Sequence, residues 1–272
     1  MPVSGQIPPK SWIPQNNVVG WVQNMKTNYV GHEGIYQRRR AEGQVGWDAT
    51  EAGYSVFKTH VERIMARGNA PQSGRLLELG CGAGNMTVWF AQKGYKACGI
   101  DIAPTAIDWA KERAENDDVQ VELTVGSVVT LRAYPDCCFD FVFDGHCLHC
   151  IIGEDRAKLL ESVWRVLRPG GYIMINTMCA PVNPERLEGY DPVTLCTFFG
   201  DVPTRYFGEA DDILAEITAA KFEVIRYDFG QDEADQVSRD LVVEARKPTQ
   251  ESITQHAAQD EESAAASSPP VS

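Results

Sequence analysis

The chain has 272 residues, of which 43% are hydrophobic and 23% charged, and its formal net charge is −13 at pH 7. This composition is typical of a globular protein with a core of its own and excludes a largely disordered chain. An acidic surface repels phosphate backbones, so the charge argues against nucleic acid as a substrate. No apolar run approaches the roughly 20 residues that span a bilayer, so we expect no membrane segment.

The chain divides into three zones. Residues 1–72 form an N-terminal segment rich in aromatic and charged side chains, and residues 1–20 lack the basic start and apolar stretch of a secretory signal. Residues 73–247 alternate apolar runs with helical stretches, and residues 248–272 are expected to be a disordered tail. The eight cysteines are irregularly spaced, which is typical of reduced thiols. We therefore expect a cytoplasmic protein.

The middle zone predicts an α/β fold. Strands are expected at residues 75–79, 95–101, 119–125, 139–144, 172–177, 222–227 and 240–245, and helices at residues 85–93, 104–116, 155–167 and 210–220. This alternation predicts βαβ units and a doubly wound, Rossmann-like sheet of seven strands, mostly parallel, with helices on both faces. Ligands bind such sheets at the carboxyl ends of the strands.

A glycine-rich loop follows the first expected strand, in the segment Glu78-Leu79-Gly80-Cys81-Gly82-Ala83-Gly84. Glycines at alternate positions let the backbone turn sharply and approach a ligand closely, and the helix behind them offers free amides. The dinucleotide pattern G-x-G-x-x-G is not met, because Asn85 or Thr87 stands where its third glycine would be. The loop therefore argues against a nicotinamide oxidoreductase.

Asp101 ends the second expected strand. A carboxylate at this position of a doubly wound sheet can accept hydrogen bonds from both hydroxyls of a ribose. The alternative is that Asp101 only caps the helix that begins near Pro104.

Taken together, the segments LELGCGAGN (77–85) and GIDIAPTAIDWA (99–110) resemble motif I and the following acidic position of class I S-adenosylmethionine-dependent methyltransferases. The segments FDFVFD (139–144), Leu148-His149 and RVLRPGG (165–171) resemble the same family between its fourth and fifth strands. Residues 205–224 resemble its final helix and strand. The resemblance covers about residues 73–247 and implies S-adenosylmethionine as cofactor and an antiparallel last strand.

The resemblance also implies the cofactor site. The glycines would face the methionine portion and the ribose, Glu78 would help to hold that end, and Asp101 would take the ribose hydroxyls. Ile102 would pack on the adenine, and Asp144 would lie where the reactive methyl group sits. Ser127 matches the adenine-edge position, where many members have aspartate. The implied set is Trp47, Glu78, Gly80, Gly82, Gly84, Asp101, Ile102, Ser127, Val128 and Asp144.

Residues 36–48 resemble the N-terminal segment of thiopurine, halide and tellurite methyltransferases, with Gly46-Trp47-Asp48 as the matching point. The functional interpretation is a lid in which Tyr36 and Trp47 exclude water from the pocket. The alternative is an amphipathic helix packed on the sheet. Arg39, within the run Arg38-Arg39-Arg40, would grip a carboxylate of the acceptor, or else the run is a solvated face.

The stretch Asp144-Gly145-His146-Cys147-Leu148-His149-Cys150 allows a metal site, a redox pair or the wall of a pocket. No second C-x-x-C pair occurs in the chain, so we expect no metal. His146 is the candidate general base, with Asp144 as the other candidate catalytic residue. The alternative for His146 is an oriented wall residue.

The sequence therefore predicts a methyltransferase acting on a small molecule, either a soft thiol or halide or a small amine or amino acid. A soft acceptor needs no base, whereas an amine or hydroxyl does. Residues 179–204 are too long for a simple connection and are expected to shape the acceptor pocket, with Tyr206 in its wall. The alternatives are a non-catalytic S-adenosylmethionine-binding regulator and a methyltransferase of proteins. We expect no nucleic-acid or membrane partner.

Overall fold

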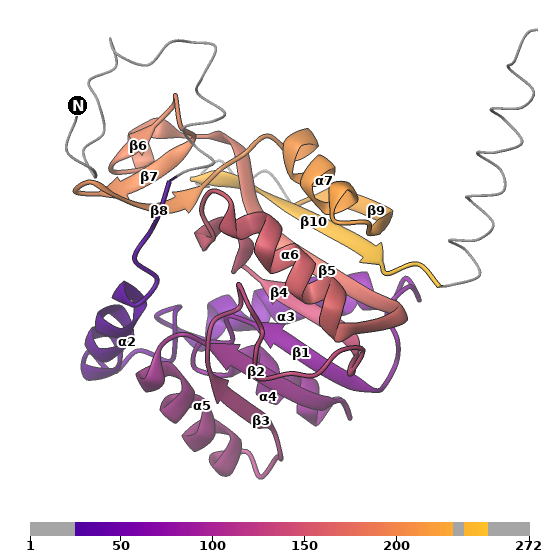
Figure 1. The fold of residues 1–272 in the computed structure, drawn as a ribbon. Coiled ribbons are helices and arrows are strands. Elements are labelled where there is room, and N and C mark those ends of the chain that lie inside the picture. Colours follow the sequence, from indigo (N-terminus) through magenta and orange to yellow (C-terminus); the bar gives the residue numbers. More distant parts are fainter. Residues whose placement is uncertain (1–24, 231–236, 250–272) are drawn as a thin grey trace, which may run out of the picture.

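The computed structural model describes residues 25–230 and 237–249. Its centre is a seven-stranded sheet with helices on both faces, and a three-stranded sheet lies beside one end of it (Figure 1). The predicted doubly wound α/β fold is confirmed. The helices are α2 (Gly31–Ala41), α3 (Glu51–Met65), α4 (Asn85–Gln92), α5 (Pro104–Asn116), α6 (Asp155–Val166) and α7 (Ala210–Ala219), with short 3-10 turns η3 (Leu148–Cys150) and η4 (Pro184–Arg186).

The strand order of the large sheet is β3-β2-β1-β4-β5-β10-β9. The chain runs outward from β1 to β3, returns beside β1 as β4, and so creates a topological switch point between β1 and β4. Strand β10 pairs antiparallel with both β5 and β9, as predicted for the last strand. The strands are β1 (Arg75–Leu79), β2 (Lys96–Asp101), β3 (Glu122–Val125), β4 (Phe139–Gly145), β5 (Leu167–Val182), β9 (Glu223–Phe229) and β10 (Ser238–Arg246).

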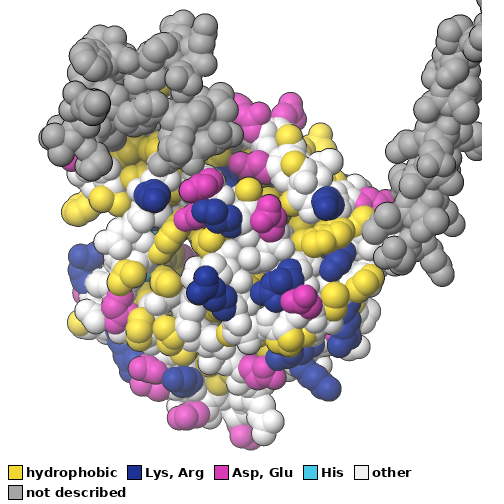
Figure 2. Space-filling model, viewed as in Figure 1, with side chains coloured by type: hydrophobic (Ala, Val, Ile, Leu, Met, Phe, Trp, Pro, Cys, Tyr) yellow, Lys and Arg dark blue, Asp and Glu magenta, His cyan; other side chains and the backbone are white. Residues whose placement is uncertain are grey.

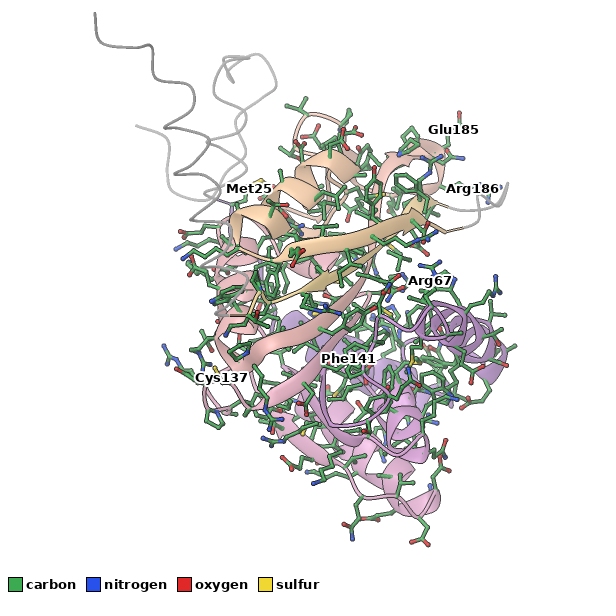
Figure 3. The ribbon with its side chains drawn as sticks, turned by 90° about the vertical axis from the view of Figure 1, so that its right-hand side faces the viewer. Met25, Arg67, Cys137, Phe141, Glu185 and Arg186 are labelled. Carbon is green, nitrogen blue, oxygen red and sulfur yellow. The ribbon has the colours of Figure 1, made fainter. Side chains whose placement is uncertain are left out.

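Alternate side chains of each strand enter one of two cores. On one face, Leu76, Phe141 and Phe143 pack against Val61 and Ile64 of α3 and against α4. On the other face, buried side chains of β1, β2 and β5 pack against α6 and α7. Figure 3 shows Phe141 in the interior and Cys137 at the edge of the molecule. The two apolar faces explain why the expected strands are near-continuous apolar runs.

Strand β5 differs from the sequence prediction in length. It was expected at residues 172–177 but runs from Leu167 to Val182. Its ends are held by pairing, with Leu167 opposite Phe139 of β4 and Val182 opposite Ser238 of β10. The strand then leads into β6 (Tyr190–Asp191), β7 (Cys196–Phe199) and β8 (Val202–Tyr206), which form the small antiparallel sheet. Of residues 179–204, the first four therefore belong to the end of β5, and most of the rest to the small sheet and its connections.

The N-terminal segment folds onto the sheet domain. Helix α2 is joined to the start of α5, because the carboxylate of Glu33 accepts hydrogen bonds from the backbone N–H and the hydroxyl of Thr105, at 3.0 and 2.5 Å. Helix α3 is part of the core, since Val61 and Ile64 are fully buried. Helix α3 and the sheet therefore share one core. Residues 1–24, and the part of the predicted tail from residue 250 onward, lie outside the described residues.

Candidate active site

A cavity of about 740 Å³ opens at the carboxyl ends of β1, β2 and β4, beside the switch point. The topology places it there, because neighbouring parallel strands end at one edge of the sheet. Its walls include ten of the predicted site residues: Tyr36, Trp47, Glu78, Gly80, Gly82, Asp101, Ile102, Ser127, Val128 and His146. Four others are outside the lining: Arg39, Gly84, Asp144 and Tyr206.

The glycine loop brings bare backbone to the cavity. Gly82 has φ +53°, and a Cβ there would lie 2.5 Å from the Tyr36 hydroxyl oxygen. At Gly80 a Cβ would lie 2.9 Å from the sulfur of Cys147. The left-handed backbone and the lack of room both require glycine, because Tyr36 and Cys147 pack directly against the loop backbone. Gly84 serves packing, since its Cβ would lie 2.7 Å from that of Ala110 on α5.

Asp101 closes this loop against the end of β2. One carboxylate oxygen accepts a hydrogen bond from the backbone N–H of Gly82 at 2.9 Å, and the other accepts from that of Ala103 at 2.9 Å. Burial raises its pKa above the ordinary value, although these backbone donors oppose the shift. The second bond lies in the turn before α5, whose N-cap residue is Ala103 and which has no side-chain cap, so the capping alternative is not what the structure shows. The first bond ties the carboxylate to the glycine loop.

Two further carboxyl groups are buried beside the loop. Burial raises the pKa of Glu78 to about 8, and the hydroxyl of Thr87 donates a hydrogen bond to it. Burial raises the pKa of Asp144 to about 7. One oxygen of Asp144 accepts from the backbone N–H of Cys147 at 2.8 Å, and the other has no partner among the described residues. Asp144 therefore fixes the turn after β4 from behind the cavity wall.

Tyr36 and Trp47 cover the loop from the N-terminal side. Their rings meet edge to face with centroids 5.6 Å apart, and Tyr36 is only 5% exposed. The guanidinium of Arg39 lies 4.8 Å above the Trp47 ring and donates a hydrogen bond to the Trp47 carbonyl oxygen. Arg39 therefore holds Trp47 in place. Helix α2 packs on α5 and not on the sheet, since Tyr36 lies in a cluster with Ala103 and Ala106.

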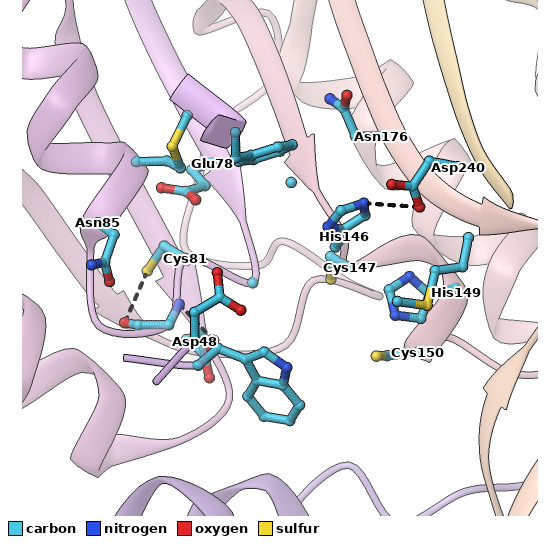
Figure 4. Close-up of a pocket in the computed structure, with 18 of the residues that line it drawn as sticks. Asp48, Glu78, Cys81, Asn85, His146, Cys147, His149, Cys150, Asn176 and Asp240 are labelled. Atoms are coloured by element: carbon cyan, nitrogen blue, oxygen red, sulfur yellow. Dashed lines mark hydrogen bonds and ion pairs between the residues drawn. The ribbon is translucent and has the colours of Figure 1, made fainter. Parts of the chain in front are cut away.

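His146 lies at the opposite end of the cavity, in the turn after β4. Its backbone N–H donates to the carbonyl oxygen of Asn176 at 2.9 Å, and its ring stacks on Phe57 of α3 at 5.3 Å. Nε2 lies 3.4 Å from Oδ1 of Asp240 on β10 (Figure 4). Burial lowers the pKa of His146, but the carboxylate of Asp240 outweighs it, so the pKa lies above the ordinary value.

Several lining residues were not among the predicted ones. Tyr54, Phe57 and His60 of α3, Asn176 of β5 and Asp240 of β10 all face the cavity. Tyr206, which was predicted, instead lies 4.8 Å beneath the guanidinium of Arg156. The spacing of Tyr54, Phe57, His60 and Ile64 follows one face of a helix and would have indicated the α3 wall. Asn176 and Asp240 have no such local pattern.

The cysteines of this region are free thiols, and Cys81, Cys147 and Cys150 line the cavity. Within residues 25–230 and 237–249, no three His, Cys, Asp or Glu side chains are arranged to hold a metal ion. The cavity is thus built from backbone, aromatic rings, carboxylates and imidazoles. Such a set fits an adenosine-containing cofactor, because it offers the Asp101 carboxylate for a ribose, a glycine loop without side chains and an apolar wall at Ile102 and Val128.

The chain is similar to known methyltransferases. Residues 77–175 match the family model described as a methyltransferase domain. Phosphoethanolamine N-methyltransferase 1 of Arabidopsis thaliana is 30% identical over 167 residues, which are 58% of this chain and 32% of the relative. A 2-heptyl-1-hydroxyquinolin-4(1H)-one methyltransferase of Mycobacteroides abscessus is 30% identical over 122 residues, 44% of this chain and 53% of the relative. The chain spans about a third of the length of the phosphoethanolamine enzymes it matches.

Solved structures show the same fold. An S-adenosylmethionine-dependent methyltransferase of Methanosarcina mazei superposes with a TM-score of 0.57 at 22% identity, over 68% of this chain and 98% of that chain. The 1,6-didemethyltoxoflavin-N1-methyltransferase of Burkholderia thailandensis, solved with 1,6-didemethyltoxoflavin and S-adenosylhomocysteine, has a TM-score of 0.54 at 17% identity over 83% of this chain and 93% of that chain. The predicted resemblance is confirmed at the level of fold and domain.

Proposed function

Because this chain carries a class I S-adenosylmethionine-dependent methyltransferase domain, we propose that it transfers the methyl group of that cofactor to a small-molecule acceptor. One observation carries the proposal. A single cavity joins the glycine loop and Asp101 at one end to His146 and Asp240 at the other. A cofactor held at the loop would therefore share this cavity with an acceptor held near His146.

The residues at the loop end would hold the cofactor. Asp101 would take the ribose, the amides of the glycine loop would approach the methionine end, and Ile102 and Val128 would flank the adenine. S-adenosylmethionine supplies, when bound, an electrophilic methyl group on a sulfonium. The leaving group is already activated, so the protein mainly aligns the acceptor behind the methyl group, and alignment alone lowers a barrier by several kcal/mol. Tyr36 and Trp47 would exclude water from this end.

The shape and surface of the protein favour a small acceptor. A cavity of about 740 Å³ lies within the range of about 300–1,000 Å³ that small ligands occupy. Basic and acidic side chains are interspersed on the face shown in Figure 2, without a continuous basic stripe. Relatives are named for small acceptors, such as phosphoethanolamine and a hydroxyquinolone. No helix in the described part of the chain is long and apolar enough to cross a membrane.

The test combines binding with transfer. Purified protein is first titrated with S-adenosylmethionine by calorimetry and then incubated with the methyl-labelled cofactor and a pooled extract of small metabolites. We expect label in the small-molecule fraction, and none with Asp101→Ala at a cofactor concentration that saturates only the unmodified protein. Tight binding without transfer would instead favour a regulatory module, and label in added protein would favour a protein methyltransferase.

A further inference from the structure

His146 occupies a backbone conformation that side chains rarely adopt. Its φ is +73°, in the left-handed region, which costs a residue other than glycine on the order of 1–3 kcal/mol. The strain is held by the bond from its backbone N–H to Asn176, by the stack on Phe57 and by the sheet on either side. The ring is 32% exposed and lines the cavity. Several contacts therefore fix the position of the His146 imidazole at the acceptor end of the cavity.

Asp240 reaches this imidazole from another part of the sheet. It lies on β10 opposite Met178 of β5, and both residues line the cavity. Nε2 of His146 is buried and has no hydrogen-bond partner among the described residues, and Oδ1 of Asp240 lies 3.4 Å from it. This separation is long for a hydrogen bond, as is common for catalytic pairs before the substrate binds. The tautomer that donates from Nε2 to Asp240 leaves the lone pair of the ring on Nδ1.

The side-chain oxygen of Asn176 is a second polar group at the acceptor end of the cavity that lacks a hydrogen-bond partner within the described part of the chain. Asn176 is 1% exposed and lines the cavity, and its amide donates to the backbone oxygen of Asp144 at 3.3 Å. The carbonyl oxygen of the Asn176 side chain accepts no hydrogen bond from the described residues. A buried acceptor of this kind costs free energy unless a donor reaches it. A ligand with an N–H or O–H group would supply that donor.

We propose that Asp240 is the positioning residue for His146, that the pair takes a proton from the acceptor, and that the acceptor is therefore an O–H or N–H compound. This inference rests on the proposed methyltransferase function. The bond from the acceptor atom to the methyl carbon forms as the carbon–sulfur bond breaks. Sulfur keeps the electron pair, and the proton of the acceptor passes to Nδ1 of His146. Asp240 stabilises the imidazolium that results, as a carboxylate does behind a catalytic histidine.

The electrostatic surroundings favour this role. Burial lowers the pKa of His146, and the carboxylates around it raise the pKa to above its usual value. A base with a pKa in this range is matched to work near neutral pH. The titratable groups that face His146 come from five elements, namely Asp48 before α3, His60 on α3, Asp144 on β4, His149 in η3 and Asp240 on β10.

The first test follows the titration of His146 by NMR in the full chain with S-adenosylhomocysteine bound. The signal is assigned with His146→Asn, because asparagine tolerates a left-handed backbone. We expect Asp240→Asn to move the midpoint to lower pH and Asp240→Glu to restore it. Asp228→Asn removes the same charge from the neighbouring strand β9, where Asp228 is ion-paired with Arg67 at 2.7 Å, and is expected to leave the midpoint unchanged. An unmoved midpoint in Asp240→Asn would overturn the pair.

The second test uses the labelled transfer from the metabolite extract. We expect the labelled product to be an ether, an ester or a methylated amine, and His146→Asn to lower the transfer rate about 100-fold or more without weakening cofactor binding. In Asp240→Asn we expect the acid limb of the pH–rate profile to move to lower pH. The role of His146 as general base would be overturned if the labelled product were a sulfonium, a thioether or a methyl halide. Full activity in His146→Asn would overturn it as well. Absence of all transfer would overturn the proposed function too. The NMR titration of His146 tests its pairing with Asp240 whether or not transfer is observed.

Discussion

Replacing Gly82 with alanine tests whether the glycine loop and the aromatic cover are built against each other. The new Cβ would lie 2.5 Å from the hydroxyl oxygen of Tyr36 and 3.3 Å from Cζ, at a φ of +53°. The left-handed backbone costs about 1–2 kcal/mol. The Tyr36 hydroxyl must also retreat by about 1 Å to reach an ordinary contact distance.

Tyr36 has little room for this retreat. It is 5% exposed and packs against Ala103 and Ala106. Overpacking of this kind costs about 1–3 kcal/mol. The free energy of unfolding should therefore fall by about 2–5 kcal/mol in Gly82→Ala. The affinity for S-adenosylmethionine should fall as well, since the loop and the cover are displaced together.

A matched control separates strain from crowding. Gly200, in the β7–β8 turn, has φ +59° and open space around its Cβ position. Gly200→Ala should therefore lose only about 1–2 kcal/mol of unfolding free energy and leave cofactor binding unchanged. Tyr36→Phe removes the crowded oxygen, so in the double variant Gly82→Ala, Tyr36→Phe we expect most of the crowding cost to be recovered. Denaturant unfolding and calorimetric titration measure both quantities. Equal losses in Gly82→Ala and Gly200→Ala, with no recovery in the double variant, would refute the reasoning.

Three further predictions concern buried groups. Asp101→Ala should weaken S-adenosylmethionine binding by about 1–3 kcal/mol through lost hydrogen bonds, and an unchanged affinity in calorimetry would contradict the ribose assignment. Burial keeps Glu78 protonated up to its pKa of about 8, whereas the unfolded chain loses this proton near its usual 4.5. Between these values the folded state binds more protons, so stability falls as pH rises, and melting curves of Glu78→Gln should show a flatter dependence on pH. The buried carboxylate of Glu244 accepts from Arg67, Asn69 and Tyr172 at 2.8, 3.0 and 2.9 Å. Arg67→Ala leaves that charge without its cation and should cost about 3–5 kcal/mol in chemical unfolding, and a loss below about 1 kcal/mol would show that the pair is solvated.

The parts of the site that could be predicted lie in contiguous sequence. The glycine loop directly follows the buried strand β1, and Asp101 is the last residue of the neighbouring strand β2, so the local pattern places them at the same edge of the sheet. Gly80 has a left-handed φ of +61°, a conformation that a glycine in a turn makes predictable from the sequence. The order of elements likewise suffices to predict seven strands and two helical faces.

The parts that could not be predicted depend on contacts between distant elements. Asp240 meets His146 only because β10 enters the sheet beside β5. Phe57 meets it only because α3 crosses the end of β4. The length of β5 was missed because Pro169-Gly170-Gly171 is a typical end of a helix. In the structure these residues belong to β5 at an irregularity in its pairing with β4, and the backbone N–H of Gly170 donates to the carbonyl oxygen of Lys247.

The insertion of β10 between β5 and β9 also has a consequence for the nascent chain. Strand β9 is made first, and among the described residues it pairs with β10 alone. Strand β9 therefore cannot pair with the growing sheet until β10 has been made. The two strands must then add as a hairpin, late in synthesis. Maturation of the acceptor end thus waits for this step, since Asp240 arrives with it.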